Sequence, residues 1–241
     1  QFLDVGIAEQ TAVAMASAIA KNGGKPVFNV YSSFIQRTYD QLSQDLCIDS
    51  NPATILVQTA SVNGMTDVTH IGIFDIPMIS NIPNLVYIAP TTKEDYLAVL
   101  DWSIEQTDYP VAIRVPVAEL VSTGKPCTKN FAELNKYEVA QQGGKIAVIA
   151  LGSFYGMGEQ AAKLIEEKTG TAPTLINPYY ITGVDTELLE SLKKGHDVVV
   201  TLEDGVLDGG FGEKIARFYG PSDVKVINFG LKKEFIDRYN P

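Results

Sequence analysis

The sequence predicts an α/β protein with two domains, each built on a mostly parallel β-sheet that is flanked by helices. Short apolar runs alternate along the chain with longer amphipathic segments, which is the pattern of strands joined by crossover helices. Several of these runs are continuously apolar, as in strands that are buried on both faces of a parallel sheet. A stretch at residues 123–136 contains few apolar side chains and separates two such alternations, so it is predicted to be a linker.

The first domain is predicted for residues 1–122. Its helices are predicted at residues 8–22, 33–49 and 93–106, and its strands at residues 26–31, 54–57, 85–89 and 111–115. The first helix is apolar on almost every side and is therefore expected to be buried. The second helix is expected to turn Leu42, Leu46 and Ile48 toward the core. The long polar segment from Gln58 to Asp75 is predicted to be a loop, and loops of this length are often functional.

The second domain is predicted for residues 137–241. Its strands are predicted at residues 146–150, 174–177, 198–202 and 224–229, and its helices at residues 157–168, 185–193 and 213–219. His196 stands in a lysine-rich segment before a strand and is expected on the surface.

The composition excludes some classes of function. The chain has 241 residues, 45% of them hydrophobic and 20% charged, and a formal net charge of -10. This excess of acidic residues argues against a nucleic-acid partner. No apolar run is long enough to span a membrane. Cys47 and Cys127 lack the spacing of metal ligands, so we expect reduced thiols and a cytoplasmic location.

Candidate functional residues gather in the first domain. Glu9 is a single carboxylate at the start of the apolar first helix, where it is costly without a partner. The residue types alone also allow structural explanations. The helix dipole favours an acidic residue in the first turn, Phe34 fits a core, and Arg37 can pair with Asp40 or Asp45. A histidine in a loop, such as His70, is often merely exposed to solvent.

Three segments carry a family resemblance. VGIAEQ at residues 5–10, YSSFIQRTYDQ at residues 31–41 and THIGIFD at residues 69–75 resemble motifs of the pyrimidine-binding domain of thiamine diphosphate enzymes. The chain resembles the transketolase family, and within it most closely the 1-deoxy-D-xylulose-5-phosphate synthases. LEDGVLDGGFGE at residues 202–213 is similar to a segment of their C-terminal domain. The resemblance covers essentially the whole chain.

The resemblance implies a role for each candidate residue. Glu9 matches the catalytic glutamate that hydrogen-bonds N1′ of the cofactor's aminopyrimidine ring. Phe34 matches the phenylalanine that packs on that ring, and Arg37 lies in the same cofactor-binding region. Tyr31 and His70 are implied to line the substrate site. A histidine there suits catalytic proton transfer because its ordinary titration range lies near neutral pH.

The family's motif for the diphosphate and Mg²⁺, a Gly-Asp-Gly with a downstream Asn, is missing. Glu203-Asp204-Gly205 with Asn228 imitates it only loosely, because the first Gly is absent and Asn228 falls inside a predicted strand. No metal ligand is therefore predicted in this chain. The resemblance implies that the Mg²⁺ ligands belong to a diphosphate-binding domain or subunit, and that the chains assemble as a homodimer or larger. We expect the first domain to be N-terminally incomplete and the chain alone to be inactive.

Two departures concern the acceptor substrate. Gln58-Thr59 stands where the synthases have Asp-Arg, and Val117 stands where they have an arginine after the proline. Those arginines hold the acceptor's phosphate in the family, and such a site loses charge-assisted hydrogen bonds without them. In addition, the family's aspartate before the Pro-Thr-His motif is displaced by one position in Thr66-Asp67-Val68. Whether the acceptor is phosphorylated therefore stays open.

These features predict part of a thiamine diphosphate-dependent transferase. Such an enzyme moves a two-carbon ketol or acetyl unit from a ketose or 2-oxo acid to an aldehyde, and the synthases use the reaction in isoprenoid biosynthesis. One alternative is the beta subunit of a 2-oxo acid dehydrogenase, which has the same order of domains. Another is a catalytically silent assembly subunit, which the departures permit and the intact Glu9 and His70 argue against.

Overall fold

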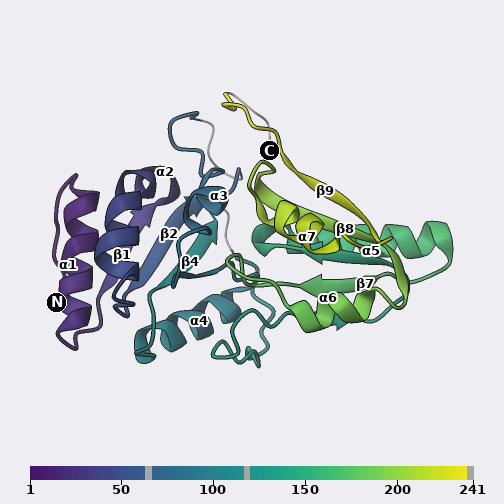
Figure 1. Ribbon diagram of the computed structural model, residues 1–241, viewed down its shortest axis with the longest axis horizontal. Helices are drawn as coiled ribbons and strands as arrows, with labels where there is room; N and C mark the ends of the chain where they lie inside the picture. Colours follow the sequence, from purple (N-terminus) through teal and green to yellow (C-terminus); the bar gives the residue numbers. More distant parts are fainter. Residues whose placement is uncertain (63–66, 117–119, 238–241) are drawn as a thin grey trace.

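The computed structural model describes residues 1–62, 67–116 and 120–237. Figure 1 shows two β-sheets side by side, each flanked by helices. The first sheet has the order β1-β2-β4-β3, and all its strand pairs are parallel. The second has the order β5-β7-β6-β8-β9 and is parallel except for β5, which runs antiparallel to β7. The predicted class, two mostly parallel sheets flanked by helices, is confirmed.

The first sheet and its helices come from the N-terminal half of the chain. Its strands are β1 (Val27–Tyr31), β2 (Thr54–Ala60), β3 (Val86–Ile88) and β4 (Val111–Pro116). Its helices are α1 (Glu9–Lys21), α2 (Ser32–Ile35), α3 (Asp75–Ile79) and α4 (Lys93–Glu105), with a 3-10 turn η1 (Gln36–Thr38) and a π-helical segment η2 (Gln41–Cys47). Thr92 and Asp95 form a reciprocal capping box at the start of α4, because each side chain accepts a hydrogen bond from the other's backbone N–H.

Two predictions about the N-terminal helices are wrong in part. Helix α1 buries Val13, Ala16 and Ala20, but Ile19 is 44% exposed. The helix is the outermost element of this half, so only one side of it meets other parts of the chain (Figure 1). In the segment predicted as one helix over residues 33–49, Leu42 and Leu46 are fully buried while Ile48 is 64% exposed. A residue two positions after Leu46 lies about 200° further round a helix and therefore faces solvent.

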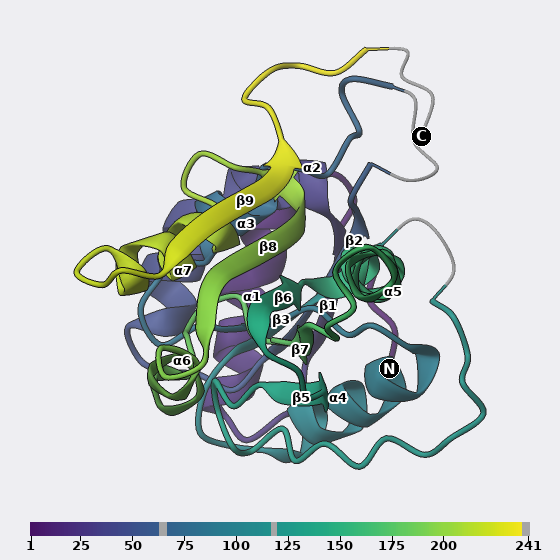
Figure 2. The same cartoon turned by 90° about the vertical axis from the view of Figure 1, so that its right-hand side faces the viewer.

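The second sheet contains one strand that the sequence did not predict. Its strands are β5 (Glu138–Gln141), β6 (Lys145–Ala150), β7 (Thr174–Asn177), β8 (His196–Val206) and β9 (Lys225–Leu231), and its helices are α5 (Tyr155–Thr169), α6 (Thr186–Leu192) and α7 (Phe211–Tyr219). The unpredicted strand is β5, a short edge strand with mostly exposed side chains. Figure 2 shows β9 along the other edge, beside β8. Among the described residues, none of the helices has the length and apolar content needed to cross a bilayer.

His196 is buried, so its predicted surface position is wrong. It begins β8, where neighbouring elements enclose it and leave 7% of the residue exposed. Nε2 lies 2.8 Å from the hydroxyl of Thr174, and Nδ1 lies 3.1 Å from the carbonyl of Leu192. A carbonyl can only accept, so Nδ1 carries the proton and Nε2 accepts from Thr174. The lysines that precede His196 in the sequence suggested exposure, but the position in the sheet decides its burial.

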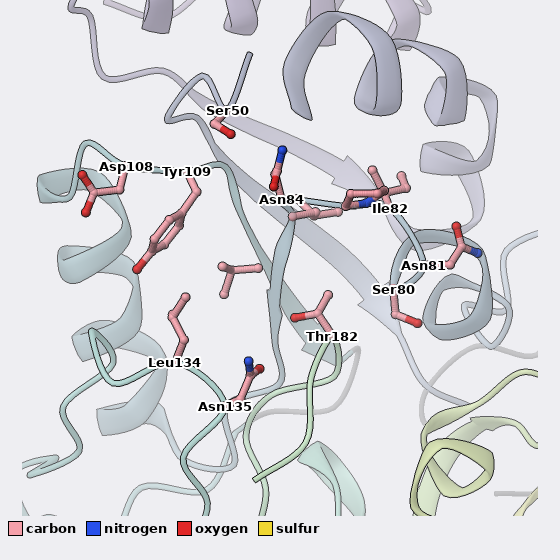
Figure 3. A pocket seen from close by; sticks show the side chains of 13 residues that line it. Ser50, Ser80, Asn81, Ile82, Asn84, Asp108, Tyr109, Leu134, Asn135 and Thr182 are labelled. Atoms are coloured by element: carbon pink, nitrogen blue, oxygen red, sulfur yellow. The ribbon is translucent and has the colours of Figure 1, made fainter. Parts of the chain in front are cut away.

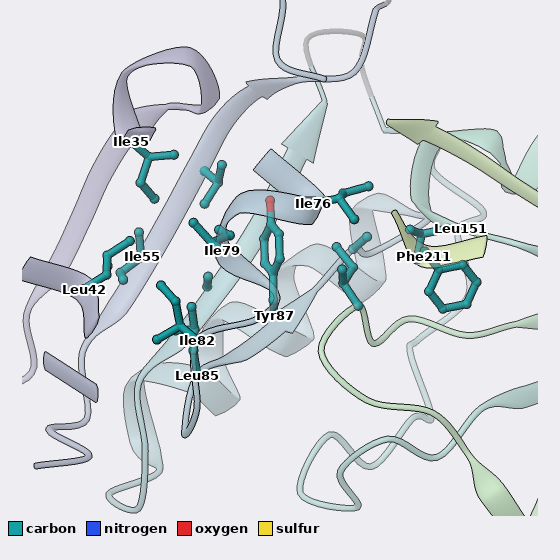
Figure 4. Packing of buried hydrophobic residues seen from close by; sticks show 14 of the residues in the cluster. Ile35, Leu42, Ile55, Ile76, Ile79, Ile82, Leu85, Tyr87, Leu151 and Phe211 are labelled. Carbon is teal, nitrogen blue, oxygen red and sulfur yellow. The ribbon is translucent and has the colours of Figure 1, made fainter. Parts of the chain in front are cut away.

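One hydrophobic core joins the two halves (Figure 4). Ile76 and Tyr87 from the first half belong to the same buried cluster as Leu151 and Phe211 from the second. Backbone hydrogen bonds add to this contact. The N–H of Ala89 donates to Tyr179 and the N–H of Ile181 donates to Tyr87, both at 2.8 Å. The segment after β3 and the strand itself are therefore tied to residues 179–181.

The predicted linker at residues 123–136 is held at its start by helix α4. The carboxylate of Glu94 accepts hydrogen bonds from the hydroxyl of Ser122 and from the N–H groups of Thr123 and Gly124. These bonds lower the pKa of Glu94 to about 2. Farther along, Phe131 is buried and its carbonyl accepts from the hydroxyl of Tyr180 at 2.8 Å. The connection is thus packed against both halves.

Candidate active site

The candidate site lies at the carboxyl ends of the strands of the first sheet. Tyr31 ends β1 opposite Gln58 in β2, and the segment carrying Phe34 and Arg37 follows β1 directly. Ligands of open parallel sheets bind outside the carboxyl ends of the strands. The loop with His70 returns to the same edge, because Gly72 forms β-bridges with Ala60 and Ser61 at the end of β2.

Three of the candidate side chains form one aromatic group. The rings of Tyr31 and Phe34 stack with their centroids 5.6 Å apart, and the ring of His70 meets Phe34 edge-on at 5.3 Å. Phe34 is half-buried and packs in part against the main core. The structure thus brings together side chains from β1, α2 and a loop some thirty-five residues away in sequence.

Glu9 and Arg37 form a second group. Arg37 Nη1 lies 3.6 Å from Glu9 Oε2, so Arg37 pairs with Glu9 rather than with Asp40 or Asp45 on its own segment. This distance brings opposite charges together but is too long for a hydrogen bond. The side chain of Glu9 is only 12% exposed, and its Oε2 has no hydrogen-bond partner among the described residues.

An unpaired buried carboxylate oxygen is unusual because it leaves the desolvation cost of the group uncompensated. It is a polar atom that a bound donor or acceptor would satisfy. The hydroxyls of Ser32 and Ser33, next to Phe34 in the chain, are likewise buried without a partner. Unmet polar groups therefore gather in the two segments that carry the candidate cofactor-binding residues.

The hydrogen bonds around His70 assign its protonated nitrogen. Thr69 Oγ1 donates to Asp67 Oδ1 at 2.8 Å and lies 2.7 Å from His70 Nδ1. A hydroxyl has one proton, so Thr69 accepts from His70 Nδ1–H, and Nε2 of the neutral ring keeps its lone pair. Hydrogen bonds from the N–H and the hydroxyl of Thr69 also lower the pKa of Asp67, which keeps this acceptor charged. His70 is therefore oriented to exchange a proton through Nε2.

The displaced acidic residue of the sequence prediction, Asp67, thus acts on His70 through Thr69. Its neighbour Thr66 lies outside the described residues, and so does Val117. Thr59 is described and has a left-handed backbone, with φ of 58°. Arg114, in β4, is 2% exposed and ion-paired with Asp75 and Asp204, so it is not available to a substrate phosphate.

Gly72 allows the His70 loop to lie directly on the sheet edge. A Cβ atom at this position would meet the carbonyl oxygen of Thr59 at 2.4 Å and the Cβ of Ser32 at 2.6 Å. Both distances are shorter than a carbon atom tolerates, and one contact is with backbone. The sequence prediction missed this residue, although it lies inside the THIGIFD segment.

Replacing Gly72 with alanine is expected to lower the free energy of unfolding by about 1–3 kcal/mol, because the added methyl group overpacks the site. It should also displace the His70 ring. Gly144→Ala is the matched control, since nothing lies within 4 Å of the Cβ it would add. Urea denaturation of both variants measures the difference. Equal stability of the two would contradict the close packing of the loop.

The acidic segment of β8 has a structural role. Glu203 is fully buried, and its carboxylate accepts from the N–H groups of Phe211 and Gly212 at 2.8 and 2.7 Å, at the start of α7. Asn228 accepts from the hydroxyl of Thr201 at 2.7 Å. Within the part of the chain that the structure describes, no group of three or more His, Cys, Asp or Glu side chains is arranged to hold a metal ion.

Comparison with known proteins identifies the class of this fold. Residues 1–122 match the family model of the transketolase pyrimidine-binding domain, and residues 135–241 match that of the transketolase C-terminal domain. The chain therefore belongs to the transketolase family.

Within that family, the chain is similar to 1-deoxy-D-xylulose-5-phosphate synthases. It is 38% identical to the Clostridium tetani protein over 238 residues, which are 98% of this chain and 38% of that protein. It is 37% identical to the Clostridium perfringens (strain SM101) protein over 244 residues, covering 100% of this chain and 39% of that protein. The chain thus spans less than two fifths of the length of these relatives.

A solved structure has the same fold. It is described as a split-gene transketolase in the form of an inactive beta4 tetramer. The two chains share 23% sequence identity and a TM-score of 0.83, over 97% of this chain and 76% of the other.

Proposed function

We propose that this chain supplies the pyrimidine-binding and C-terminal parts of a thiamine diphosphate-dependent transferase. The proposed boundaries are residues 1–122 for the first domain, 123–136 for the linker and 137–241 for the second domain. The observation that carries the proposal is the buried oxygen Oε2 of Glu9, which has no hydrogen-bond partner among the described residues and lies in the segment that matches the pyrimidine-binding family. A ring nitrogen of an aminopyrimidine is a group that would satisfy it.

The residues present fit this cofactor. Glu9 would hold a proton against the ring nitrogen, Arg37 would keep the Glu9 side chain in place, and Phe34 would pack on the ring. When bound, thiamine diphosphate supplies a nucleophilic carbon for the cleavage and formation of carbon–carbon bonds. His70 would move a proton to or from a substrate oxygen through Nε2. Tyr31, which is 45% exposed beside Phe34, would form one wall of the substrate site.

The reaction we propose transfers a two-carbon ketol or acetyl unit from a ketose or 2-oxo acid to an aldehyde. The similarity to 1-deoxy-D-xylulose-5-phosphate synthases supports this class over a beta subunit of a 2-oxo acid dehydrogenase. We further propose that the acceptor is unphosphorylated, or phosphorylated at another position. Thr59 replaces an arginine of the synthases, and Arg114 is ion-paired with Asp75 and Asp204 and so cannot bind a substrate phosphate.

The diphosphate and Mg²⁺ would be held by a further domain or a partner subunit. The relatives are more than twice as long as this chain, and the solved structure with the same fold is a split-gene transketolase that forms a tetramer. Both observations support a division of the site between polypeptide segments. We propose a cytoplasmic assembly of at least two copies of this chain with that missing half.

Calorimetric titration of thiamine diphosphate with Mg²⁺ tests the proposal. We expect weak binding to this chain alone and tight binding once the diphosphate-binding half is restored. In the restored assembly, Glu9→Gln should lower the transferase rate about 100-fold, because glutamine cannot exchange a proton with the ring nitrogen. Unchanged turnover in Glu9→Gln would refute the role of Glu9. Absence of binding in every state would favour a silent assembly subunit.

A further inference from the structure

A buried group of charged and polar residues connects the two halves behind the candidate site. We call Arg114, Asp75, Tyr87 and Asp204 the Arg114 cluster. Arg114 lies in β4, Asp75 begins α3 and Tyr87 lies in β3, whereas Asp204 lies in β8 of the second half. Their exposed fractions are 2%, 1%, 0% and 0%, in the order Arg114, Asp75, Tyr87 and Asp204.

Each edge of the Arg114 guanidinium group has a partner. Nε donates to Asp75 Oδ2 at 2.7 Å, Nη1 donates to Asp204 Oδ1, and Nη2 donates to the carbonyl oxygen of Gly72 at 3.3 Å. The hydroxyl of Tyr87 donates to Asp75, and the hydroxyl of Ser153 donates to Asp204 at 2.5 Å. The planar group of Arg114 is thus fixed in one orientation.

Two of these partners belong to the segment that carries His70. Gly72 follows His70 by two residues, and Asp75 follows it by five. The second half also holds Ile73, which lies between Gly72 and Asp75, because the N–H of Val206 in β8 donates to the carbonyl of Ile73 at 3.0 Å. A chain of direct contacts therefore runs from Asp204 through Arg114 to the backbone that positions the imidazole ring.

A buried ion pair is a costly way to hold two domains together. Apolar residues of similar volume often give equal or higher stability, because charges lose their hydration on burial. The Arg114 cluster adds geometric specificity, because a guanidinium group between two carboxylates and a carbonyl allows only one arrangement of its hydrogen-bond partners. The arrangement that is fixed here is that of the residues following His70.

We propose that Arg114 and Asp204 are positioning residues for His70, so that the second half of the chain sets the geometry of the site on the first. The part that His70 plays in the reaction rests on the function proposed above. The physical link from Asp204 to the His70 loop does not depend on it. An experiment on the chain without cofactor can therefore refute the link between Asp204 and the His70 loop while the proposed function stands. Equally, the proposed function can be refuted while this link is found.

The chain has only two histidines, which makes nuclear magnetic resonance a direct readout. His196 is buried in the second half and serves as an internal reference for its fold. Asp204→Asn removes the charge that holds Arg114 and keeps the shape of the side chain. Ser153→Ala is a milder variant that removes the hydrogen bond to Asp204 and, with it, the 3.3 Å contact between the hydroxyls of Ser153 and Ser61. Tyr219→Phe is the matched control, because it removes a buried hydrogen bond, to the Leu189 carbonyl, that lies within the second half.

In Asp204→Asn we expect the His70 ring resonance and its pH titration curve to change while those of His196 stay as in the parent chain. Amide hydrogen exchange in residues 70–74 should become about tenfold faster, because the segment opens locally. Ser153→Ala should change the same signals in the same direction by less, and Tyr219→Phe should leave them unchanged.

Three results would overturn the proposal. Unchanged His70 signals in both Asp204→Asn and Ser153→Ala would mean that the cluster only adds stability. Equal changes at His70 and His196 would mean that the second half is disturbed as a whole. Changes in Tyr219→Phe as large as those in Asp204→Asn would show that the His70 loop responds to any loss of stability. If Asp204→Asn does not fold, the His70 signals of Ser153→Ala and Tyr219→Phe are compared instead, and equal changes in these two variants would overturn the proposal.

Discussion

Replacing Arg114 with methionine is expected to lower the free energy of unfolding by about 3–5 kcal/mol. The variant leaves the carboxylates of Asp75 and Asp204 buried, at 1% and 0% exposure, without the cation that lies between them. Methionine fills much of the space but offers no donor to either carboxylate or to the carbonyl of Gly72. Burial raises the pKa of Tyr87 well above its usual value, so its hydroxyl stays protonated and remains the donor to Asp75.

The loss should come from the uncompensated charges rather than from the missing side chain. A triple variant that combines Arg114→Met with Asp75→Asn and Asp204→Asn should therefore recover a large part of the lost stability. Lys21→Met is the control for an exposed ion pair, because Lys21 and Asp49 lie 2.8 Å apart with 65% and 51% of their side chains exposed. It should lower the free energy of unfolding far less than Arg114→Met does, because solvent and salt screen an exposed ion pair.

Urea denaturation at neutral pH measures all three variants, and the slope of each transition shows whether unfolding remains cooperative. A loss below about 1 kcal/mol in Arg114→Met would mean that the carboxylates find other partners or water. A triple variant as unstable as the single one would place the loss in packing. Either result would contradict the electrostatic explanation.

The predicted strands of both sheets come from local sequence and are found where expected. Residues 111–115 and 146–150 are continuous apolar runs, and strands β4 and β6 are indeed buried on both faces over most of their length. The elements that local sequence could not predict are those that depend on contacts with distant parts of the chain. Helix α3 lies in a segment with loop-like composition, and its first residue, Asp75, is held by Arg114 from a distant strand.

In the candidate site, too, local motifs could be predicted from the sequence, whereas contacts between distant residues could not. The motifs that carry Glu9, Phe34 and His70 could be named from the sequence, and the structure places Phe34 against His70. The partner of Arg37 could not be named, since Asp40 and Asp45 are nearer in sequence than Glu9. The link from Asp204 to Gly72 could not be predicted either, because its two ends lie more than a hundred residues apart in sequence and meet only after both sheets have formed.

The stability of this chain is expected to fall by about 2 kcal/mol between pH 5 and pH 7.5 because of Glu203. Burial raises the pKa of Glu203 to about 7, although the N–H groups of Gly212 and Phe211 act in the opposite direction. In the unfolded chain the same group titrates near the usual glutamate value of about 4.3. Between these two values the folded state binds the proton more tightly. The stabilisation is therefore fully present below pH 4 and is lost as the pH rises through 7.

Glu203→Gln should abolish this dependence on pH, because glutamine does not titrate. The variant keeps one oxygen to accept from the start of α7 but leaves the other N–H without an acceptor, so it should be less stable at pH 5. The difference from the parent chain should then narrow by about 2 kcal/mol as the pH rises to 7.5. Urea denaturation at several pH values measures this difference in the free energy of unfolding. The series ends at pH 7.5 because burial lowers the pKa of Lys214 to about 8, and that side chain titrates at higher pH. Glu213 is an exposed carboxylate in the first turn of the same helix. Glu213→Gln is therefore the control and should retain the parent chain's dependence of stability on pH. If Glu203→Gln also retained that dependence, the proton would be bound by another group, and the buried carboxylate at the start of α7 would be ionised throughout this range.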